Sequence, residues 1–566
     1  MKKNICASAL LLFVLGCSNS ESPVGMDSMQ VAESSVNVLT SAIVSDPSLD
    51  PYTVENMNKA MRKTVLAKTS AMDSLEVESM ELKPNYLYVR FLVNGKAELA
   101  ELKSRDTTVV YFKHPMDYKP IKKPAVYVDP TLPDSVKAYF ATVPVDFDFG
   151  ATKHDIIKEL YLVEPLDGDE EEQDSVSAAR SLLKKAAPGN SVVEKLADLG
   201  ISLQEIEWNS FRMTGNAGER TPSLAPNLAL AKMNTYAWSL LGSGKRYKGH
   251  LEFDDDVLGR QPLVGVRVTG GYSYYWRTTH TDENGDFKIP EKWNYSIDYE
   301  ANFDSDDFLL EDGHSVYGED LEMENNNKKQ DWYQAFHRDT AKWCVVWTAA
   351  YQYWYGDNFG LKRPRQNTAS NWSLDIEVYY KNKKDYENLW PTSGLFIGCG
   401  AGESNGQYSY VGGLEDVCIS TYGRSSEEIY STVIHEVAHT SHYWNTSKSL
   451  SDFFNLPYGF RNTYTRGVEY YFSKNRYGNK AKISYFHDYT GLVQDLIDSD
   501  INTADGKKNI DKVQGFSIID IEKAFFATKS LSDLKKYVKK NLPSGTKNRK
   551  YTESNLDKLF DYWMDL

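Results

Sequence analysis

The chain has 566 residues, 41% of them hydrophobic, and a formal net charge of -15 at pH 7. This length exceeds what a single hydrophobic core usually organises, so we expect several domains. The acidic balance argues against a nucleic-acid partner, because phosphates are bound by clustered Lys and Arg.

An apolar run behind two lysines opens the chain. Residues 5–16 are too few to span a bilayer as a mature helix and are typical of a signal peptide. The run ends in VLGC, residues 14–17, which resembles the bacterial lipobox, where the cysteine becomes the lipidated first residue. We therefore expect residues 1–16 to be removed and Cys17 to be the only membrane anchor of an extracytoplasmic lipoprotein, at the outer membrane or cell surface. An ordinary secretory signal that contains a cysteine is the alternative.

Three cysteines would remain after this processing: Cys344, Cys399 and Cys418. An odd number cannot form a complete disulfide framework, although one bridge between Cys399 and Cys418 stays open. A metal site built on thiolates is not expected, because none of the three has a cysteine partner at ligand spacing.

Composition changes mark the expected domains in the first half of the chain. Residues 17–50 are Ser-rich and poor in aromatics, which indicates a tether. Helical and strand-like stretches alternate over residues 51–167 and predict an N-terminal α+β domain. The run DGDEEEQDS, residues 167–175, carries too much like charge to be packed. We therefore expect an acidic linker and helical connector over residues 168–245. A calcium site in the run is the weaker alternative, because the run lacks the spacing of a Gly-centred loop.

Short, closely spaced strands over residues 246–310 predict a small β-sandwich. PLVGVRV at 262–268 and TDENGDF at 281–287 resemble the PLxGVxV strand and TDxNGxF turn of carboxypeptidase regulatory-like (transthyretin-like) domains. The resemblance implies an accessory module, to which we assign no chemistry. Helical patterns dominate residues 311–566. The expected fold is multidomain α+β: an N-terminal α+β domain, a small β-sandwich and a mainly helical C-terminal domain.

The stretch HEVAHTSHYW, residues 435–444, holds three of the ten histidines of the chain. Just before it, Ser425 and Glu428 have the spacing of a capping box, in which each side chain satisfies the other residue's backbone N–H. No Gly or Pro follows until after Trp444. The sequence therefore predicts an uninterrupted helix through the three histidines.

The H-E-x-x-H pattern within this stretch predicts a zinc site. On a helix His435 and His439 lie one turn apart on one face, where both imidazoles can reach one ion. Glu436 is turned about 100° from His435 and would stand beside the ion, where a general base for a metal-bound water is needed. A histidine-rich helix that binds no metal is the alternative.

A catalytic zinc needs a third protein ligand, because the fourth position is kept for water. His442 lies a further turn along the helix from His439, too far for an ion held by the first two histidines, so we expect it to be a supporting or surface residue. Glu469 is the first glutamate after the motif, begins an aromatic helical run and is the predicted third ligand. Asp452 is nearer but is expected in a loop, which makes it the weaker candidate.

An H-E-x-x-H helix, a loop and a second helix with a glutamate resemble the gluzincins, the thermolysin-like zinc metallopeptidases. Asn445 excludes the third histidine of the metzincin pattern. Val468 and Ser473 stand where the thermolysin ligand region has an Asn and a supporting Asp, so the subfamily stays unassigned. The resemblance implies that Glu436 activates the zinc water and passes its proton to the leaving amine, with a protein, glycoprotein or peptide as substrate.

Stabilising the oxyanion needs a donor besides zinc. The candidates are Arg466, Tyr470, Tyr471 and His487. The strand LEDVCIS, residues 414–420, precedes the helix and is expected to line the cleft and pair with an extended substrate.

The expected function is zinc-dependent peptide-bond hydrolysis by a membrane-anchored lipoprotein. A non-catalytic surface lipoprotein, such as an adhesin or a glycan-binding or peptide-binding protein that keeps a zinc-stabilised peptidase fold, is the alternative. Glu436 separates the two, because hydrolysis requires this carboxylate and binding does not. A structural lipoprotein without any metal is a third hypothesis.

Overall fold

The computed structural model describes residues 49–565 with several stretches left aside. These stretches are residues 70–72, 117–128, 130, 134, 165–190, 217–244, 294–295, 314–318, 326–329, 365–373, 380–393, 398–400, 405–406, 411–415, 448 and 487. The expected signal peptide, Cys17, the acidic run at 167–175, Cys399 and His487 therefore lie outside the described residues.

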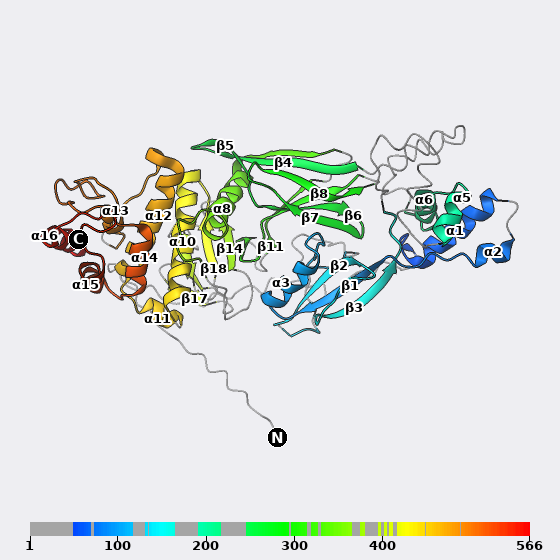
Figure 1. The fold of residues 1–566 in the computed structure, drawn as a ribbon, viewed down its shortest axis with the longest axis horizontal. Helices are drawn as coiled ribbons and strands as arrows, with labels where there is room; N and C mark the ends of the chain where they lie inside the picture. Colours follow the sequence, from blue (N-terminus) through cyan, green and yellow to red (C-terminus); the bar gives the residue numbers. More distant parts are fainter. Residues whose placement is uncertain are drawn as a thin grey trace, which may run out of the picture.

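The molecule is elongated, with a helical cluster at each end and the sheets between them (Figure 1). Buried side chains of the described residues gather in three clusters, the largest of which runs from the central sheets into the C-terminal helices. Helices and several sheets are both present, which confirms the expected multidomain α+β class.

The N-terminal part contains two separate cores. One is a group of helices packed around Met57, Met61 and Ile206. Its helices are α1 (Val54–Lys68), α2 (Ser74–Glu78), α5 (Ser191–Asp198) and α6 (Leu203–Met213). The other is an antiparallel sheet with β1 in the middle, beside the helix α3. Its elements are β1 (Tyr86–Val93), α3 (Lys96–Arg105), β2 (Lys137–Pro144) and β3 (Lys153–Leu160).

Two four-stranded sheets in the middle of the chain share one core. One contains β4 (Lys245–Asp255), β5 (Gly259–Pro262), β8 (Asp286–Trp293) and β13 (Trp332–Phe336). The other contains β6 (Arg267–Tyr272), β7 (Tyr275–His280), β9 (Asp298–Asn302) and β12 (Glu322–Asn325). In the turn before β8, Asp282 Oδ1 accepts the N–H groups of Asn284 and Asp286 at 2.8 and 3.0 Å. Because β12 and β13 follow residue 310, these sheets extend beyond the expected boundary.

Gly265 lies where the central sheets pack against the C-terminal part. Its φ is +73°, and a Cβ placed there would meet the Tyr351 ring at 2.0 Å. Beside it, the indole N–H of Trp347 donates to Val264 O at 2.9 Å. Trp347 and Tyr351 both belong to α8 (Arg338–Trp354), so this close approach holds that helix against the sheets.

Gly265→Ala is expected to lower the free energy of unfolding by about 1–3 kcal/mol beyond the backbone strain, because the new methyl group displaces the Tyr351 ring. Gly259→Ala is the matched control, since Gly259 has a φ of +81° and no atom of the described residues within 4 Å of its Cβ position. Thermal unfolding of both variants measures the difference. Equal loss in the two would show that the Tyr351 contact adds nothing.

The C-terminal part is built on a five-stranded sheet of order β11-β10-β14-β18-β15. Its strands are β10 (Phe308–Asp312), β11 (Glu319–Asp320), β14 (Leu374–Tyr379), β15 (Gly394–Ile397) and β18 (Asp416–Ser420). β18 pairs in parallel with β14 on one side and antiparallel with β15 on the other. The expectation that this strand pairs with a substrate is wrong, because both of its edges already hold neighbouring strands.

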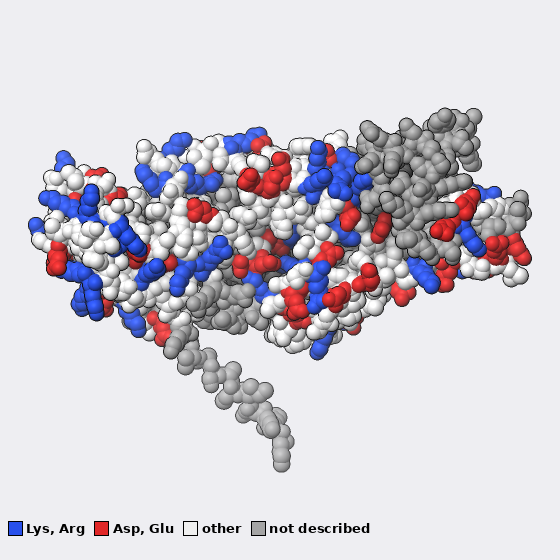
Figure 2. All heavy atoms as spheres, viewed as in Figure 1, with Lys and Arg blue, Asp and Glu red and all other residues white. Residues whose placement is uncertain are grey.

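Helices cover this sheet and continue to the C-terminus (Figure 1). α10 (Ser426–Thr446) contacts α8, α12 (Tyr458–Tyr477), β15 and β18. The remaining elements are β16 (Ala401–Ser404), β17 (Gln407–Tyr410), α11 (Leu450–Phe454), η4 (Gly478–Lys480), α13 (Leu492–Ile497), α14 (Ile518–Phe526), α15 (Leu531–Asn541) and α16 (Glu553–Met564). No helix of the described residues has both the length and the apolarity needed to cross a bilayer. Lys and Arg are interspersed with Asp and Glu over the described part of the face in Figure 2.

Candidate functional site

The helix that carries the histidines begins where the capping box predicts. The Ser425 hydroxyl accepts the N–H of Glu428 at 3.3 Å, and Glu428 Oε2 accepts the N–H of Ser425 at 2.8 Å. From there α10 runs without a break to Thr446, and most of its residues are buried. The predicted helix is confirmed, and its burial between α8 and α12 fixes where its side chains point.

The Nε2 atoms of His435 and His439 converge on one point. Both lie near the Thr465 hydroxyl oxygen of α12, at 3.1 and 3.3 Å. The two imidazole rings are 4.9 Å apart and only 6% and 7% exposed. The i, i+4 spacing thus brings two ring nitrogens together at a buried point, which a hydroxyl group occupies.

Glu469 contacts the opposite side of the His435 ring. Its Oε2 lies 2.8 Å from His435 Nδ1, and its Oε1 accepts a hydrogen bond from Arg466 Nη1 at 2.8 Å. Burial raises the pKa of Glu469 to about 7, although the charges of Arg466 and Arg424 oppose this rise. The carboxylate is therefore directed at a histidine and not at the point where the Nε2 atoms meet. Its assignment as the third zinc ligand stays a prediction.

Both histidines are held in the neutral form, which is the form in which imidazole binds metals. Burial, with the charge of Arg466 adding to it, holds the pKa of His435 well below its usual value, and burial does the same for His439. When Glu469 is ionised, a neutral His435 donates its Nδ1–H to it and carries the lone pair on Nε2. Carboxylates bonded to Nδ1 orient histidine ligands in this way at many metal sites. The pair therefore fits two zinc ligands.

Among the described residues, no further His, Cys, Asp or Glu lies where it would complete a zinc site with His435 and His439. In the part of the chain that the structure describes, no group of three or more His, Cys, Asp or Glu side chains is arranged to hold a metal ion. The reason lies in α12, where Thr465 faces the two Nε2 atoms and Glu469, one turn later, faces Nδ1. Thr465 was missed in the sequence, although its position four residues before Glu469 places both on one helix face.

Glu436 is buried beside the pair, at 6% exposure. The nearby Tyr489 has its pKa raised by burial first, then by Tyr458 and by the negative charge of Glu436. The Tyr489 ring is 5.7 Å from the His435 ring, and the hydroxyl groups of Tyr489 and Tyr458 are 2.8 Å apart. These two tyrosines are candidate functional residues that could not be found from the sequence, because no motif links them to the two histidines.

Of the predicted oxyanion donors, Arg466 lies at the site, whereas Tyr470 and Tyr471 contact other parts of the protein. Arg466 lies at the site, bonded to Glu469 and 4.8 Å from the centre of the Tyr489 ring. Tyr471 packs edge-on against Phe359, with ring centres 5.0 Å apart. Tyr470 lies towards Asp498 and Asp495, whose charges add to burial in raising its pKa to about 12. Successive helix positions are about 100° apart, so the two tyrosines leave the face that Glu469 shares with Thr465.

His442 is enclosed by aromatic rings. It is 1% exposed, is stacked on Phe526 with centres 5.3 Å apart, and meets Phe453 and Tyr464 edge-on. Neither ring nitrogen has a hydrogen-bond partner among the described residues. Burial, together with the charge of Arg461, lowers its pKa to about 3. This environment is that of a core residue and not of a ligand.

His442→Phe is expected to raise the free energy of unfolding by roughly 1 kcal/mol at neutral pH, because two buried nitrogens without partners are removed. Below pH 6.5 the unfolded chain protonates His442, but the folded chain does not until about pH 3. Wild type therefore loses stability as the pH falls through this window, and the advantage of the variant should widen. Chemical denaturation at several pH values measures this. Zinc content should be unchanged, and its loss would instead make His442 a ligand.

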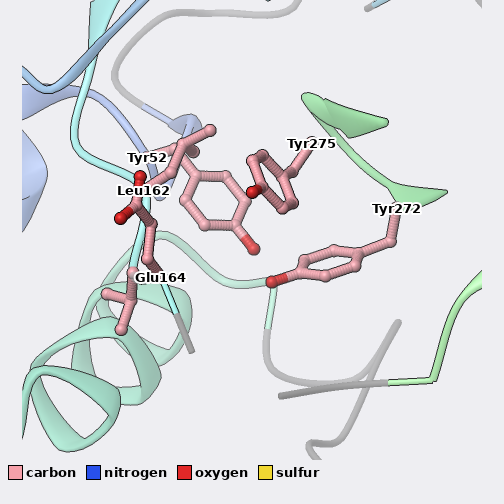
Figure 3. A pocket seen from close by; sticks show the side chains of 6 residues that line it. Tyr52, Leu162, Glu164, Tyr272 and Tyr275 are labelled. Atoms are coloured by element: carbon pink, nitrogen blue, oxygen red, sulfur yellow. The ribbon is translucent and has the colours of Figure 1, made fainter. Parts of the chain in front are cut away.

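A small cavity lies far from the histidines, between the N-terminal part and β6–β7. Its volume of about 10 Å³ leaves room for little more than one water molecule, and it is lined by Tyr52, Leu162, Val163, Glu164, Tyr272 and Tyr275. Figure 3 shows the three tyrosine rings gathered around it. Tyr86 donates to Glu164 Oε1 at 2.6 Å, so the carboxylate is already engaged by a neighbouring side chain. We assign no chemistry to this cavity.

No family model, curated protein or solved structure matches this chain. Function is therefore inferred from the geometry of the site and not from a relative.

Proposed function

We propose that α10 and α12 form the centre of a zinc-dependent peptidase, carried by a lipoprotein that Cys17 anchors outside the cytoplasm. The convergence of the His435 and His439 Nε2 atoms on the Thr465 hydroxyl is the observation on which this proposal depends. The contact of Glu469 with His435 Nδ1 supports it, because it favours the ring tautomer that a metal ligand needs.

His435 and His439 would hold the ion through Nε2. A bound zinc would supply Lewis acidity and would lower the pKa of a water molecule bound to it. Glu436 accepts the proton of the attacking water and later donates it to the leaving amine. Arg466 lies 4.8 Å from the centre of the Tyr489 ring, which is 5.7 Å from the His435 ring, so Arg466 and the Tyr489 hydroxyl are the candidate donors that stabilise the oxyanion.

Glu469 has two assignments in this proposal. In the first it is the third ligand, as its place after the motif predicts. In the second it positions His435, as its 2.8 Å contact with Nδ1 favours. The two assignments predict different zinc affinities for Glu469→Gln, in which an amide replaces the carboxylate.

A binding lipoprotein that keeps a zinc-stabilised fold is the second candidate. The observation that favours it is the hydroxyl of Thr465 at the point where a catalytic site has a third strong donor.

Zinc analysis of the purified soluble chain, paired with cleavage of a broad peptide library, separates the candidates. Stoichiometric zinc with cleavage supports the peptidase, and zinc without cleavage supports the binding protein. Absence of zinc overturns both.

A further inference from the structure

Four hydrogen-bonding groups surround the hydroxyl group of Thr465, whose side chain is completely buried. Its oxygen lies 3.1 Å from His435 Nε2, 3.3 Å from His439 Nε2, 3.4 Å from Arg461 O and 3.3 Å from Asn462 O. A hydroxyl group has one proton to donate and two lone pairs. When either carbonyl oxygen of the helix accepts the proton, the lone pairs are left on the side of the histidines.

The distances from this oxygen to the two ring nitrogens match those between neighbouring ligands of a tetrahedral zinc ion. Zinc binds imidazole nitrogens at about 2.0–2.1 Å, so two ligands at tetrahedral corners are about 3.3 Å apart. The measured distances from Thr465 Oγ1 to His435 Nε2 and His439 Nε2 are 3.1 and 3.3 Å. The oxygen is too far from both nitrogens to stand at the position of the ion itself. It lies where a third ligand would lie.

Thr465 and Glu469 contact opposite sides of the His435 ring. Thr465 lies at Nε2, and Glu469 lies one helix turn later with Oε2 2.8 Å from Nδ1. The second oxygen of Glu469 accepts a hydrogen bond from Arg466 at 2.8 Å. Glu469 would therefore have to leave both partners to reach an ion on the Nε2 side, whereas Thr465 is already there.

We propose that the hydroxyl oxygen of Thr465 is the third protein ligand of the zinc ion, beside His435 and His439. This assignment, which rests on the proposed zinc-dependent function, leaves Glu469 to position His435. Three protein ligands keep one position open, which is the arrangement of a catalytic zinc site. Neutral hydroxyl groups of Ser and Thr bind divalent cations elsewhere, as the P-loop hydroxyl binds magnesium.

The kind of donor sets how firmly the ion is held. A neutral hydroxyl oxygen is a weaker donor to zinc than an imidazole nitrogen, a thiolate or a carboxylate. Thr465 therefore gives a site with two strong ligands and one weak ligand, and we expect its zinc to exchange more readily than zinc held by three strong donors.

Zinc affinity of the purified, metal-stripped chain, measured by competition with a chelator, provides the first test. Thr465→Val replaces the hydroxyl by a methyl group of similar size and should weaken zinc binding by roughly 10–100-fold. Thr465→Ser keeps the oxygen and should bind zinc as wild type does. Thr463→Val is the matched control, because Thr463 is completely buried on the same helix and its hydroxyl contacts Thr490 Oγ1 at 2.9 Å. It should also keep wild-type affinity.

Thr465→Cys provides a spectroscopic signature that a loss of stability cannot produce. With cobalt(II) added in place of zinc, a thiolate at this corner should bind the ion and give a sulfur-to-cobalt charge-transfer band in the near ultraviolet. Wild type and Thr463→Cys should give no such band. If Thr465→Val does not fold, this band decides alone.

Two results would overturn the ligand while leaving the zinc site and its proposed function intact. One is wild-type zinc affinity in Thr465→Val together with no charge-transfer band in Thr465→Cys. The other is tighter zinc binding by Thr465→Val, which would show that the hydroxyl competes with the ion. Absence of zinc from wild type is a different outcome, because it overturns the proposed function and this ligand with it.

Discussion

Glu436→Gln is expected to lower peptide cleavage by about 10²–10⁴-fold, the usual contribution of a general base. The amide nearly matches the carboxylate in size, so the buried position beside His435 should keep its packing. The amide cannot accept the proton of the attacking water, so cleavage should slow. Glu436 is not a proposed zinc ligand, so zinc content should stay at the wild-type level. Initial rates on a peptide substrate, with zinc measured on the same samples, provide the test.

Glu428→Gln is the matched control for this change. It makes the same substitution on the same helix, and a glutamine can still accept the Ser425 N–H of the capping box. Activity should remain close to wild type. If Glu436→Gln cleaves as fast as this control while both bind zinc, Glu436 is not the base and the binding-protein hypothesis gains support.

The histidine helix could be predicted because its signals are local. The capping box, the absence of Gly and Pro, and the i, i+4 spacing all lie within one continuous stretch, and each describes a short-range interaction. The convergence of His435 and His439 on one point follows from the same spacing. What the spacing could not show was which residue of α12 would face them.

The features that were missed depend on contacts between distant segments. β13 pairs in parallel with β4 from more than 80 residues away, so the boundary expected at residue 310 could not include it. β18 looked like a strand free to bind a peptide, because nothing in its sequence reveals β14 and β15 on either side. At the site, Tyr489 reaches His435 from a loop beyond α12. Long-range pairing leaves no periodic pattern in the sequence.

Glu469→Ala is expected to lower zinc affinity by roughly 10–100-fold, because His435 loses the group that holds its ring and tautomer. It also leaves Arg466 without its carboxylate partner at a largely buried position, so stability should fall as well. Competition with a zinc chelator measures the affinity, and thermal unfolding measures the stability. Glu427→Gln, which changes another buried glutamate without contact to either histidine, should keep wild-type zinc affinity.

Glu469→Gln decides between the two assignments of this residue. The amide oxygen can still accept the Nδ1–H of His435, so a positioning residue should tolerate the change much better than it tolerates alanine. A zinc ligand should lose affinity almost as far with glutamine as with alanine, because a neutral amide is a much weaker donor to zinc than a carboxylate. The 2.8 Å contact between Glu469 and Nδ1 leads us to expect the first result. Unchanged zinc in Glu469→Ala together with loss of zinc in His442→Ala would contradict both assignments and place the third ligand on α10.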